Sequence, residues 1–528
     1  KKSGKYLRIV QSFKQNGVTR HKTLYSLGKV EDYPPEQLQR IATKLLELAG
    51  CRLEDIVKED LREVHRFNYG YALVIKALWK RLNLDEWMKK INYKRRIRFD
   101  WLSALELMIT ERINEPCSKR SVSFHQGEYI GFGKKNIDLH HLYRCLDLLS
   151  QEQESLKKHL FITQQNLFST TLDVVFYDVT TLYFDSQKEQ ENSLRQKGYS
   201  KDGKVHKTQV VLGLLVDKLR NPITYHLYQG NAYEGKTMID ALEDLQKKYA
   251  IDQVIVVADS AMIDASNRAF MEKHGIRYII GDRIKNLPRT IAQQLIDKEN
   301  HRSIKTHQEK DVVFSYSSVT YENRKIICTY SSKRAAKDRA EREKLIEKAQ
   351  KFLANPSAIH QLRKRGAGRF IKENSPKNYA LDVERIHDDE KWDGYKAIST
   401  NSNLSEEEVI GRYAHLFEVE HAFRCLKTEL EIRPMFHWTN QRIEGHIAMC
   451  FMAYTMLNHL RLLTGLQNKT IVRALDSMQL SEISEGKEKE HFYLRSAINA
   501  EQEKIINALK LEVPNDCTPQ RLINQYFT

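Results

Sequence analysis

The stretch Leu172-Asp-Val-Val-Phe-Tyr-Asp178 is a short apolar run that ends in a carboxylate, and Val254-Ile-Val-Val-Ala-Asp259 repeats this pattern. Near-continuous apolar runs of this length predict strands that are buried on both faces. We therefore expect Asp178 and Asp259 at the carboxyl ends of two buried strands, where binding sites are commonly built. The alternative is that each aspartate only caps the helix that follows it.

Outward from these two runs, the pattern alternates between strands and helices. Apolar spacing predicts a hairpin of two strands at residues 209–217 and 223–228. It also predicts helices at 235–248 and 264–274 and a last strand at 278–281. Strand, hairpin, helix, strand, helix, strand is the order expected of a ribonuclease-H-like fold. The predicted fold class is an α/β core with a mixed sheet flanked by helices, a β-containing insertion and a mostly α N-terminal region.

Changes of pattern along the chain predict its domain boundaries. We expect a β-hairpin at 1–34, a mostly helical region at 35–168, the core at 169–284 and 396–465, an insertion at 285–395, and a helical tail at 466–528. Within the insertion, strands are expected near 312–316 and 326–330, followed by a charged helix near 333–353.

A helix is predicted from Ser405, whose Ser-x-x-Glu408 capping box marks its start, through at least Leu430. On that helix Tyr413, Glu420 and Lys427 are seven residues apart. Seven residues at 3.6 per turn drift by only about 20°, so the three side chains should share one face. The alternative is an ordinary solvated stripe with a Glu420–Arg424 pair.

The pattern Tyr413-x-x-Leu416-x-x-x-Glu420-x-x-x-x-x-x-Lys427 resembles the signature helix of bacterial insertion-sequence transposases of the DDE class. The resemblance covers roughly residues 170–465. Leu416 stands where many members have Arg, and Ser260-Ala261 where the family usually has a basic residue and Gly. The other stretches that carry the resemblance are Phe176-Tyr-Asp178-Val-Thr-Thr-Leu182, Gly230-Asn231, Val257-Ala-Asp259-Ser-Ala-Met262, Asp393-Gly394-Tyr395 and Arg433-Pro-Met-Phe436.

This resemblance implies DNA cleavage and joining by two-metal phosphoryl transfer. Asp178, Asp259 and Glu420 would be the catalytic residues and would hold two Mg²⁺ ions, for which Mn²⁺ would substitute. Tyr413 and Lys427 would position phosphate. The implied partners are the terminal inverted repeats of an insertion sequence, target DNA and a second copy of the chain, with residues 35–168 expected to serve DNA binding or dimerisation. Two alternatives remain: a ribonuclease-H-like nuclease that only hydrolyses, and a non-catalytic DNA-binding protein derived from a transposase.

The charge of the chain agrees with a DNA partner. Lys+Arg 85 against Asp+Glu 69 gives 85 − 69 = +16, and a basic balance of this size favours a polyanion. DNA contacts are expected from two basic segments and the signature helix, at Lys197, Lys201, Lys204, Lys207, Arg363, Lys364, Arg365, Tyr413, Arg424 and Lys427. The alternative is that both basic segments are simply exposed to solvent and contact no DNA.

Several other functions find no support in the sequence. Gly198 to Val205 nearly spells a phosphate-binding P-loop, but Val205 replaces the Ser/Thr metal ligand, so no nucleotide cofactor is expected. The most apolar stretch, residues 447–460, is too short to span a membrane. Seven scattered cysteines without a CxxC pair fit a reduced compartment, and we expect a cytoplasmic bacterial protein that is nucleoid-associated when bound to DNA. Trp438 is expected either to stack an unpaired base or to pack in the core.

Overall fold

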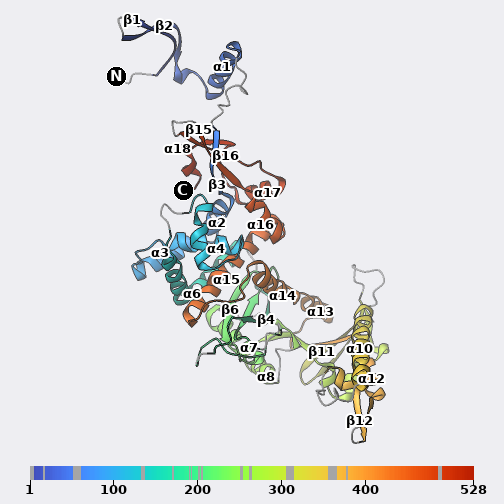
Figure 1. The fold of residues 1–528 in the computed structure, drawn as a ribbon. Coiled ribbons are helices and arrows are strands. Elements are labelled where there is room, and N and C mark those ends of the chain that lie inside the picture. The colour runs from blue at the N-terminus through green and yellow to red at the C-terminus, as the bar shows by residue number, and fades with distance from the viewer. Residues whose placement is uncertain are drawn as a thin grey trace.

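A computed structural model describes residues 5–527 except 16–17, 51–60, 133–136, 169–171, 190, 192, 200–202, 204–205, 250–253, 261–264, 305–313, 355–365, 376–377 and 486–489. The α/β core with a ribonuclease-H-like mixed sheet, predicted from the sequence, is present (Figure 1). Its largest sheet has nine strands in the order β6-β5-β4-β7-β8-β14-β11-β10-β9.

The first five strands of this sheet carry the core. They are β4 (Val174–Tyr183), β5 (Gln209–Val216), β6 (Pro222–Gln229), β7 (Ile255–Ala258) and β8 (Arg277–Asp282). Strands β4, β5 and β6 are joined antiparallel, whereas β4–β7 and β7–β8 are parallel. The parallel pairs need crossovers, which α7 (Glu234–Tyr249) and α8 (Ala265–Lys273) supply.

Helices cover both faces of the core sheet because alternate side chains of each strand point to opposite faces. Tyr177, Val256 and their neighbours pack with Met238 of α7 and Met271 of α8. Phe176 and Val257 lie on the other face, in the main hydrophobic core. That core includes the buried sides of α14 (Phe417–Arg424), α15 (Asn440–Thr464) and α6 (Leu139–Phe168).

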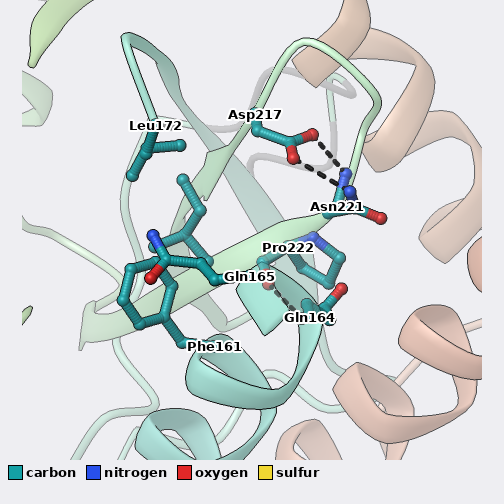
Figure 2. Close-up of a pocket in the computed structure, with 8 residues that line it drawn as sticks. Phe161, Gln164, Gln165, Leu172, Asp217, Asn221 and Pro222 are labelled. Carbon is teal, nitrogen blue, oxygen red and sulfur yellow. Dashed lines mark hydrogen bonds between the residues drawn. The ribbon is translucent and has the colours of Figure 1, made fainter. Parts of the chain in front are cut away.

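The turn between β5 and β6 fixes the core hairpin against α6 (Figure 2). Asp217 accepts hydrogen bonds from the backbone N–H groups of Leu219 at 2.7 Å and Asn221 at 2.8 Å, and from the Asn221 amide at 2.9 Å. Burial raises the pKa of Asp217. The Gln164 amide of α6 donates to the carbonyl of Pro222 at 3.2 Å, which ties the helix to the start of β6.

The region before the core is mostly helical. Its helices are α1 (Pro35–Leu48), α2 (Gly70–Arg81), α3 (Leu84–Arg95), α4 (Trp101–Ile113), α5 (Lys119–His125) and α6. Helix α15 packs against α4 and α6 and is buried continuously from Gly445 to Leu460, which explains its apolar sequence. Within the described residues, no helix is both long and apolar enough to cross a membrane.

The prediction of a helical tail at 466–528 is wrong in part. Besides α16 (Asn468–Asp476), α17 (Ala500–Leu509) and α18 (Gln520–Ile523), this segment contains β15 (Gln479–Glu485), β16 (Glu490–Arg495) and β17 (Cys517–Pro519). These strands form a four-stranded sheet, β17-β16-β15-β3, with β3 (Leu61–Asn68) from the other end of the chain. Pairing across some 400 residues stabilises these strands, and a local apolar pattern cannot show it.

The segment between the two parts of the core extends the same sheet. Strand β14 (Tyr395–Thr400) pairs with β8 and with β11 (Arg324–Ser331), and β10 (Phe314–Tyr321) and β9 (Arg302–Ser303) follow. The predicted charged helix is α10 (Ser332–Leu353). The remaining elements there are α9 (Arg289–Ile296), β12 (Ile371–Ser375), β13 (Asn378–Leu381) and α12 (Val383–Glu390).

The N-terminal hairpin lies apart from these layers in Figure 1. Strand β1 (Tyr6–Gln15) pairs antiparallel with β2 (Val18–Lys29) over its whole length, with two irregularities in register. Its side chains are mostly exposed, including Tyr25 at 63%. An isolated two-stranded hairpin is marginally stable in water.

Candidate active site

Asp178 and Asp259 lie side by side on one face of the core sheet. In the parallel pair β4–β7, Tyr177 is opposite Ala258, and each aspartate is the next residue. Asp178 is also opposite Leu214 of β5, which belongs to the main core, so its carboxylate points to the face covered by α14. The expectation that Asp178 ends its strand is wrong: β4 continues to Tyr183 because β5 still pairs with it.

Backbone groups orient both carboxylates. The N–H of Val179 donates to Oδ1 of Asp178 at 2.8 Å, and the N–H of Ser260 donates to Oδ1 of Asp259 at 2.7 Å. Asp178 is half-buried, whereas Asp259 is exposed directly after β7. Asp178 does not cap a helix, because β4 continues through it, and residues 261–264 after Asp259 lie outside the described part of the chain.

Tyr413, on α13 (Glu406–Ala414), packs against the turn that carries Asp259. A Cβ built on Gly281 of β8 would lie 2.5 Å from the Tyr413 hydroxyl and 3.0 Å from the Ser260 nitrogen, so glycine leaves room for both. The hydroxyl is buried and makes no hydrogen bond within 3.5 Å. Burial, and then the negative charge of Asp259, raise the pKa of Tyr413, which keeps it a protonated donor.

Glu420, on α14, shares two neighbours with Asp259. The negative charges of both carboxylates raise the pKa of Tyr413. The same two charges act to raise the pKa of Lys396, whereas burial lowers it. Glu420 is itself exposed, beside the buried Val419 that anchors α14 to the sheet. The structure therefore brings Asp178 and Asp259 together by register, and Asp259 and Glu420 together through shared neighbours.

Two cations at this site, Lys396 and Arg334, were not predicted from the sequence. Lys396 of β14 is half-buried, and its Nζ lies 4.5 Å from the centre of the Tyr413 ring. Burial lowers the pKa of Lys396, and the charge of Arg334 on α10 lowers it further. The only signal for Lys396 was its place directly after Asp393-Gly394-Tyr395, and its strand position became visible only with the pairing of β14 to β8.

The prediction of one continuous signature helix from Ser405 is wrong, although the capping box at Ser405 is present. It is divided into α13, α14 and a π-helical turn over Cys425–Glu429. Tightened hydrogen bonds, from His415 N–H to the Arg412 carbonyl and from Leu416 N–H to the Tyr413 carbonyl, end α13. The seven-residue spacing of Tyr413, Glu420 and Lys427 therefore runs over three elements instead of one continuous helix, although the charge of Glu420 still acts on Tyr413.

The DNA-contact candidates fall into different environments. Arg424 is exposed at the end of α14, and the Lys427 Nζ lies 5.9 Å from the centre of the Phe423 ring. Lys197 is exposed. Lys207 is ion-paired with Asp185 and lies over the Tyr183 ring. Lys201, Lys204, Arg363, Lys364 and Arg365 lie outside the described residues.

Trp438 does not pack in the core, because 56% of its surface is exposed. Its ring lies 4.2 Å from the guanidinium of Arg195, which also stacks on Phe184 at 5.1 Å. Arg195 is buried and holds the loop after β4 beside the segment that follows the π-helical turn. The end of β4 is therefore lined by cations and by one exposed aromatic ring.

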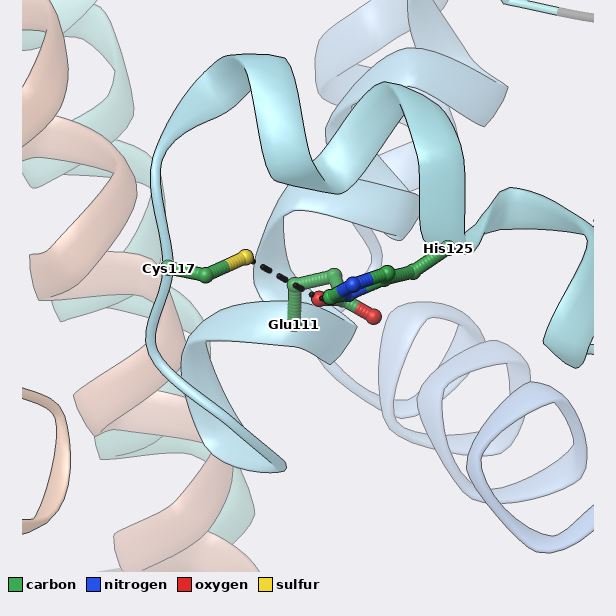
Figure 3. A group of neighbouring side chains, drawn as sticks. All are labelled: Glu111, Cys117 and His125. Carbon is green, nitrogen blue, oxygen red and sulfur yellow. Dashed lines mark hydrogen bonds and ion pairs between the residues drawn. The ribbon is translucent and has the colours of Figure 1, made fainter.

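The oxygen donors of the three carboxylates suit Mg²⁺ or Mn²⁺, which prefer oxygen ligands. In the described part of the chain, their oxygens are not all within 4.8 Å of one another. Together the three carboxylates would supply oxygen ligands for two divalent ions. A separate group in the N-terminal helical region does meet this distance: ligand atoms of Glu111, Cys117 and His125 all lie within 4.8 Å of one another (Figure 3).

Comparison with known proteins agrees with this arrangement. The family described as "Transposase DDE domain" matches residues 169–456, and that described as "IS1634 family transposase, N-terminal domain" matches residues 1–51. The chain belongs to the transposase DDE-domain family. The matched span of this transposase-family chain contains Asp178, Asp259 and Glu420, together with Lys396 and the strands of the intervening segment.

More distant comparisons add little to the family match. None of the curated proteins matches significantly. Among solved structures, the "Mos1 transposase paired-end complex with left transposon end" is similar over 34% of this chain and 59% of that chain, at 13% identity and a TM-score of 0.16. The matched part thus spans less than two thirds of the Mos1 chain.

Proposed function

We propose that this chain is a DNA transposase that cleaves the ends of an insertion sequence and joins them to target DNA. The observation that carries the proposal is the register of β4 and β7, which puts Asp178 next to Asp259 within the span matched by the transposase DDE domain. Asp178 lies on the sheet face that is covered by α14, the helix that carries Glu420.

The proposed chemistry is phosphoryl transfer in two steps. In cleavage, a water oxygen attacks the phosphorus at the transposon end, and the bond to the 3′ oxygen breaks to leave a 3′-hydroxyl and a 5′-phosphate. In joining, that 3′-hydroxyl attacks a target phosphorus and displaces a target 3′-hydroxyl. Each step exchanges one P–O bond for another, so no oxidant or nucleotide cofactor is required.

Asp178, Asp259 and Glu420 would hold two divalent ions, Mg²⁺ or Mn²⁺, with Asp178 shared between them. When bound, the ions would promote loss of the proton from the attacking oxygen and stabilise charge on the leaving oxygen. Adjacent carboxylates repel each other, and this repulsion is what a divalent cation relieves. The hydrogen bonds from Val179 and Ser260 hold the two aspartates in place for this role.

The remaining side chains would act on the phosphate itself. The Tyr413 hydroxyl is buried and protonated beside the Asp259 carboxylate, so it can donate to a phosphate oxygen bound there. Lys396 lies against the same ring and adds a positive charge beside two carboxylates. Lys427 is expected to bind a phosphate further along the DNA, as the family resemblance implies.

DNA and a second copy of the chain are the proposed partners. The net charge of +16 favours extended contact with the phosphate backbone. Joining two transposon ends to one target requires two active sites held together, so the active species is proposed to be at least a dimer. A cytoplasmic location, on the nucleoid when DNA is bound, follows from this activity.

A strand-transfer assay tests the proposal against its two alternatives. The full chain is incubated with labelled DNA of candidate insertion-sequence ends, a target plasmid and Mg²⁺ or Mn²⁺. A transposase yields cleaved ends and joined products. Cleaved ends without joined products would indicate a nuclease that only hydrolyses, and DNA binding without either product would indicate a non-catalytic protein.

A further inference from the structure

A buried, positively charged cavity lies outside the carboxylate site. Its volume is about 160 Å³, and Arg112, Lys119, His437 and His446 are among the residues that line it. Arg112 belongs to α4, Lys119 begins α5, and the two histidines come from the segment around the start of α15. This volume is far above the roughly 10–15 Å³ that admits one water, so the cavity has room for a small ligand.

The two cations of this cavity have no counter-charge in the described structure. Lys119 is 4% exposed and Arg112 is 6% exposed, yet neither forms an ion pair with a described residue. Arg112 donates from one terminal nitrogen to the carbonyls of Leu430 and Glu431, both at 3.1 Å, and from the other to the carbonyl of Cys117 at 3.4 Å, while its Nε has no partner. Glu431 also lines the cavity, and it is exposed.

The nearest buried acid is already engaged elsewhere. Glu111, next to Arg112 on α4, accepts a hydrogen bond from the Cys117 thiol at 3.2 Å and pairs with His125 at 3.0 Å. Figure 3 shows the three side chains pointing toward one another. The hydrogen bond with Glu111 raises the pKa of His125, as expected for a genuine pair. Glu111 therefore does not neutralise Lys119 or Arg112.

The surroundings of Lys119 make an empty cavity unfavourable for its charge. Burial, and then the charge of Arg112, lower the pKa of Lys119 to about 7. Burial lowers the pKa values of His437 and His446 as well, so both rings are neutral and can donate or accept hydrogen bonds. The Nδ1 atom of His446 is buried without a partner. An anion would supply the missing charge and the missing hydrogen bonds together.

We propose that this cavity binds a phosphate group through Arg112, Lys119 and His446. A tetrahedral oxyanion accepts hydrogen bonds from several directions, which matches two cations and a neutral imidazole from different elements. Free inorganic phosphate and a DNA phosphate share this chemistry.

The position of the cavity favours DNA as the source, an assignment that rests on the proposed transposase function. The N–H of Met435 donates to the carbonyl of Tyr183 at 3.0 Å, which fixes the lining segment to the end of β4. Tyr183 is five residues beyond Asp178, or about 16 Å along the strand at ~3.3 Å per residue. Phe436, which also borders the cavity, is 64% exposed and could stack a neighbouring base.

The first arm of the test uses inorganic phosphate and the full chain, and needs no catalytic activity. The thermal midpoint of the parent should rise in sodium phosphate relative to sodium chloride at equal pH and ionic strength. Lys119→Met should remove that rise and, because it deletes an unpaired buried charge, should not lower the midpoint in chloride. Lys89→Met, at an exposed lysine of α3, is the matched control and should keep the phosphate response.

The second arm measures the affinity of the same proteins for transposon-end DNA. A loss of about tenfold or more for Lys119→Met, with Lys89→Met unchanged, assigns the cavity to a DNA phosphate. Equal DNA affinity together with a lost phosphate response assigns it to free phosphate. The proposal is overturned if the parent shows no phosphate response, or if Lys119→Met keeps it; should Lys119→Met not fold, Lys119→Gln serves for the same comparison.

Discussion

Gly281→Ala is expected to damage the candidate site by steric means alone. The added Cβ would lie 2.5 Å from the Tyr413 hydroxyl, whereas ordinary contact begins at 3.4 Å, so the two groups must separate by 3.4 − 2.5 = 0.9 Å. The Ser260 backbone, at 3.0 Å from the same Cβ, limits movement in the other direction. Overpacking of this kind typically costs about 1–3 kcal/mol, and a misplacement near 1 Å can lower a rate by about 100-fold.

A double-mutant cycle separates this clash from other effects. Tyr413→Phe removes the hydroxyl that the new Cβ would meet, so Gly281→Ala/Tyr413→Phe should recover most of the stability that Gly281→Ala loses. Stability is followed by urea unfolding, and cleavage by the release of labelled DNA ends. Two results would refute the reasoning: a Gly281→Ala protein with parental stability and cleavage, or a double variant no more stable than Gly281→Ala.

Three further predictions concern DNA binding and assembly. Affinity for DNA should fall steeply between about 50 and 200 mM salt in a filter-binding titration, because each phosphate contact releases about one counterion; a flat profile would rule out extended backbone contact. Lys427→Ala should lower end binding or joining about tenfold, the loss of a charge-assisted contact of about 1.5–3 kcal/mol, while Lys427→Arg retains more; if both variants match the parent, the assigned phosphate contact is wrong. Light scattering of the complex with end DNA should give at least a dimer, and paired-end insertion by a monomer would contradict this.

The sequence predicted the core sheet well because its signals are local. Apolar runs and turn residues mark β4 to β8, and each of these strands was expected within a few residues of its place. The pairing of β3 with β15 depends on residues far apart in the chain, and both strands carry many charged side chains, so neither was predicted.

The site was predicted in outline and missed in detail. Asp178 and Asp259 stood out because each follows an apolar run, but the extension of β4 past Asp178 depends on its partner β5. The seven-residue spacing of Tyr413, Glu420 and Lys427 assumed an unbroken helix, and hydrogen bonding at His415 and Leu416 interrupts it. Lys396 and Lys119 carry no sequence motif of their own, and only the packing of distant elements reveals their surroundings.

The central claim is that Asp259 acts with Asp178 and Glu420 in DNA cleavage and joining. The direct measurement compares Asp259→Asn with Asp173→Asn, a control at the aspartate just before β4, which forms ion pairs with Lys218 at 3.7 Å and Arg412 at 3.9 Å. With transposon-end DNA, target DNA and Mg²⁺, Asp259→Asn should bind DNA within a few-fold of the parent but give neither cleaved nor joined products, while Asp173→Asn stays close to the parent. Cleavage by Asp259→Asn at the parental rate, or an equal loss in the control, would contradict the claim.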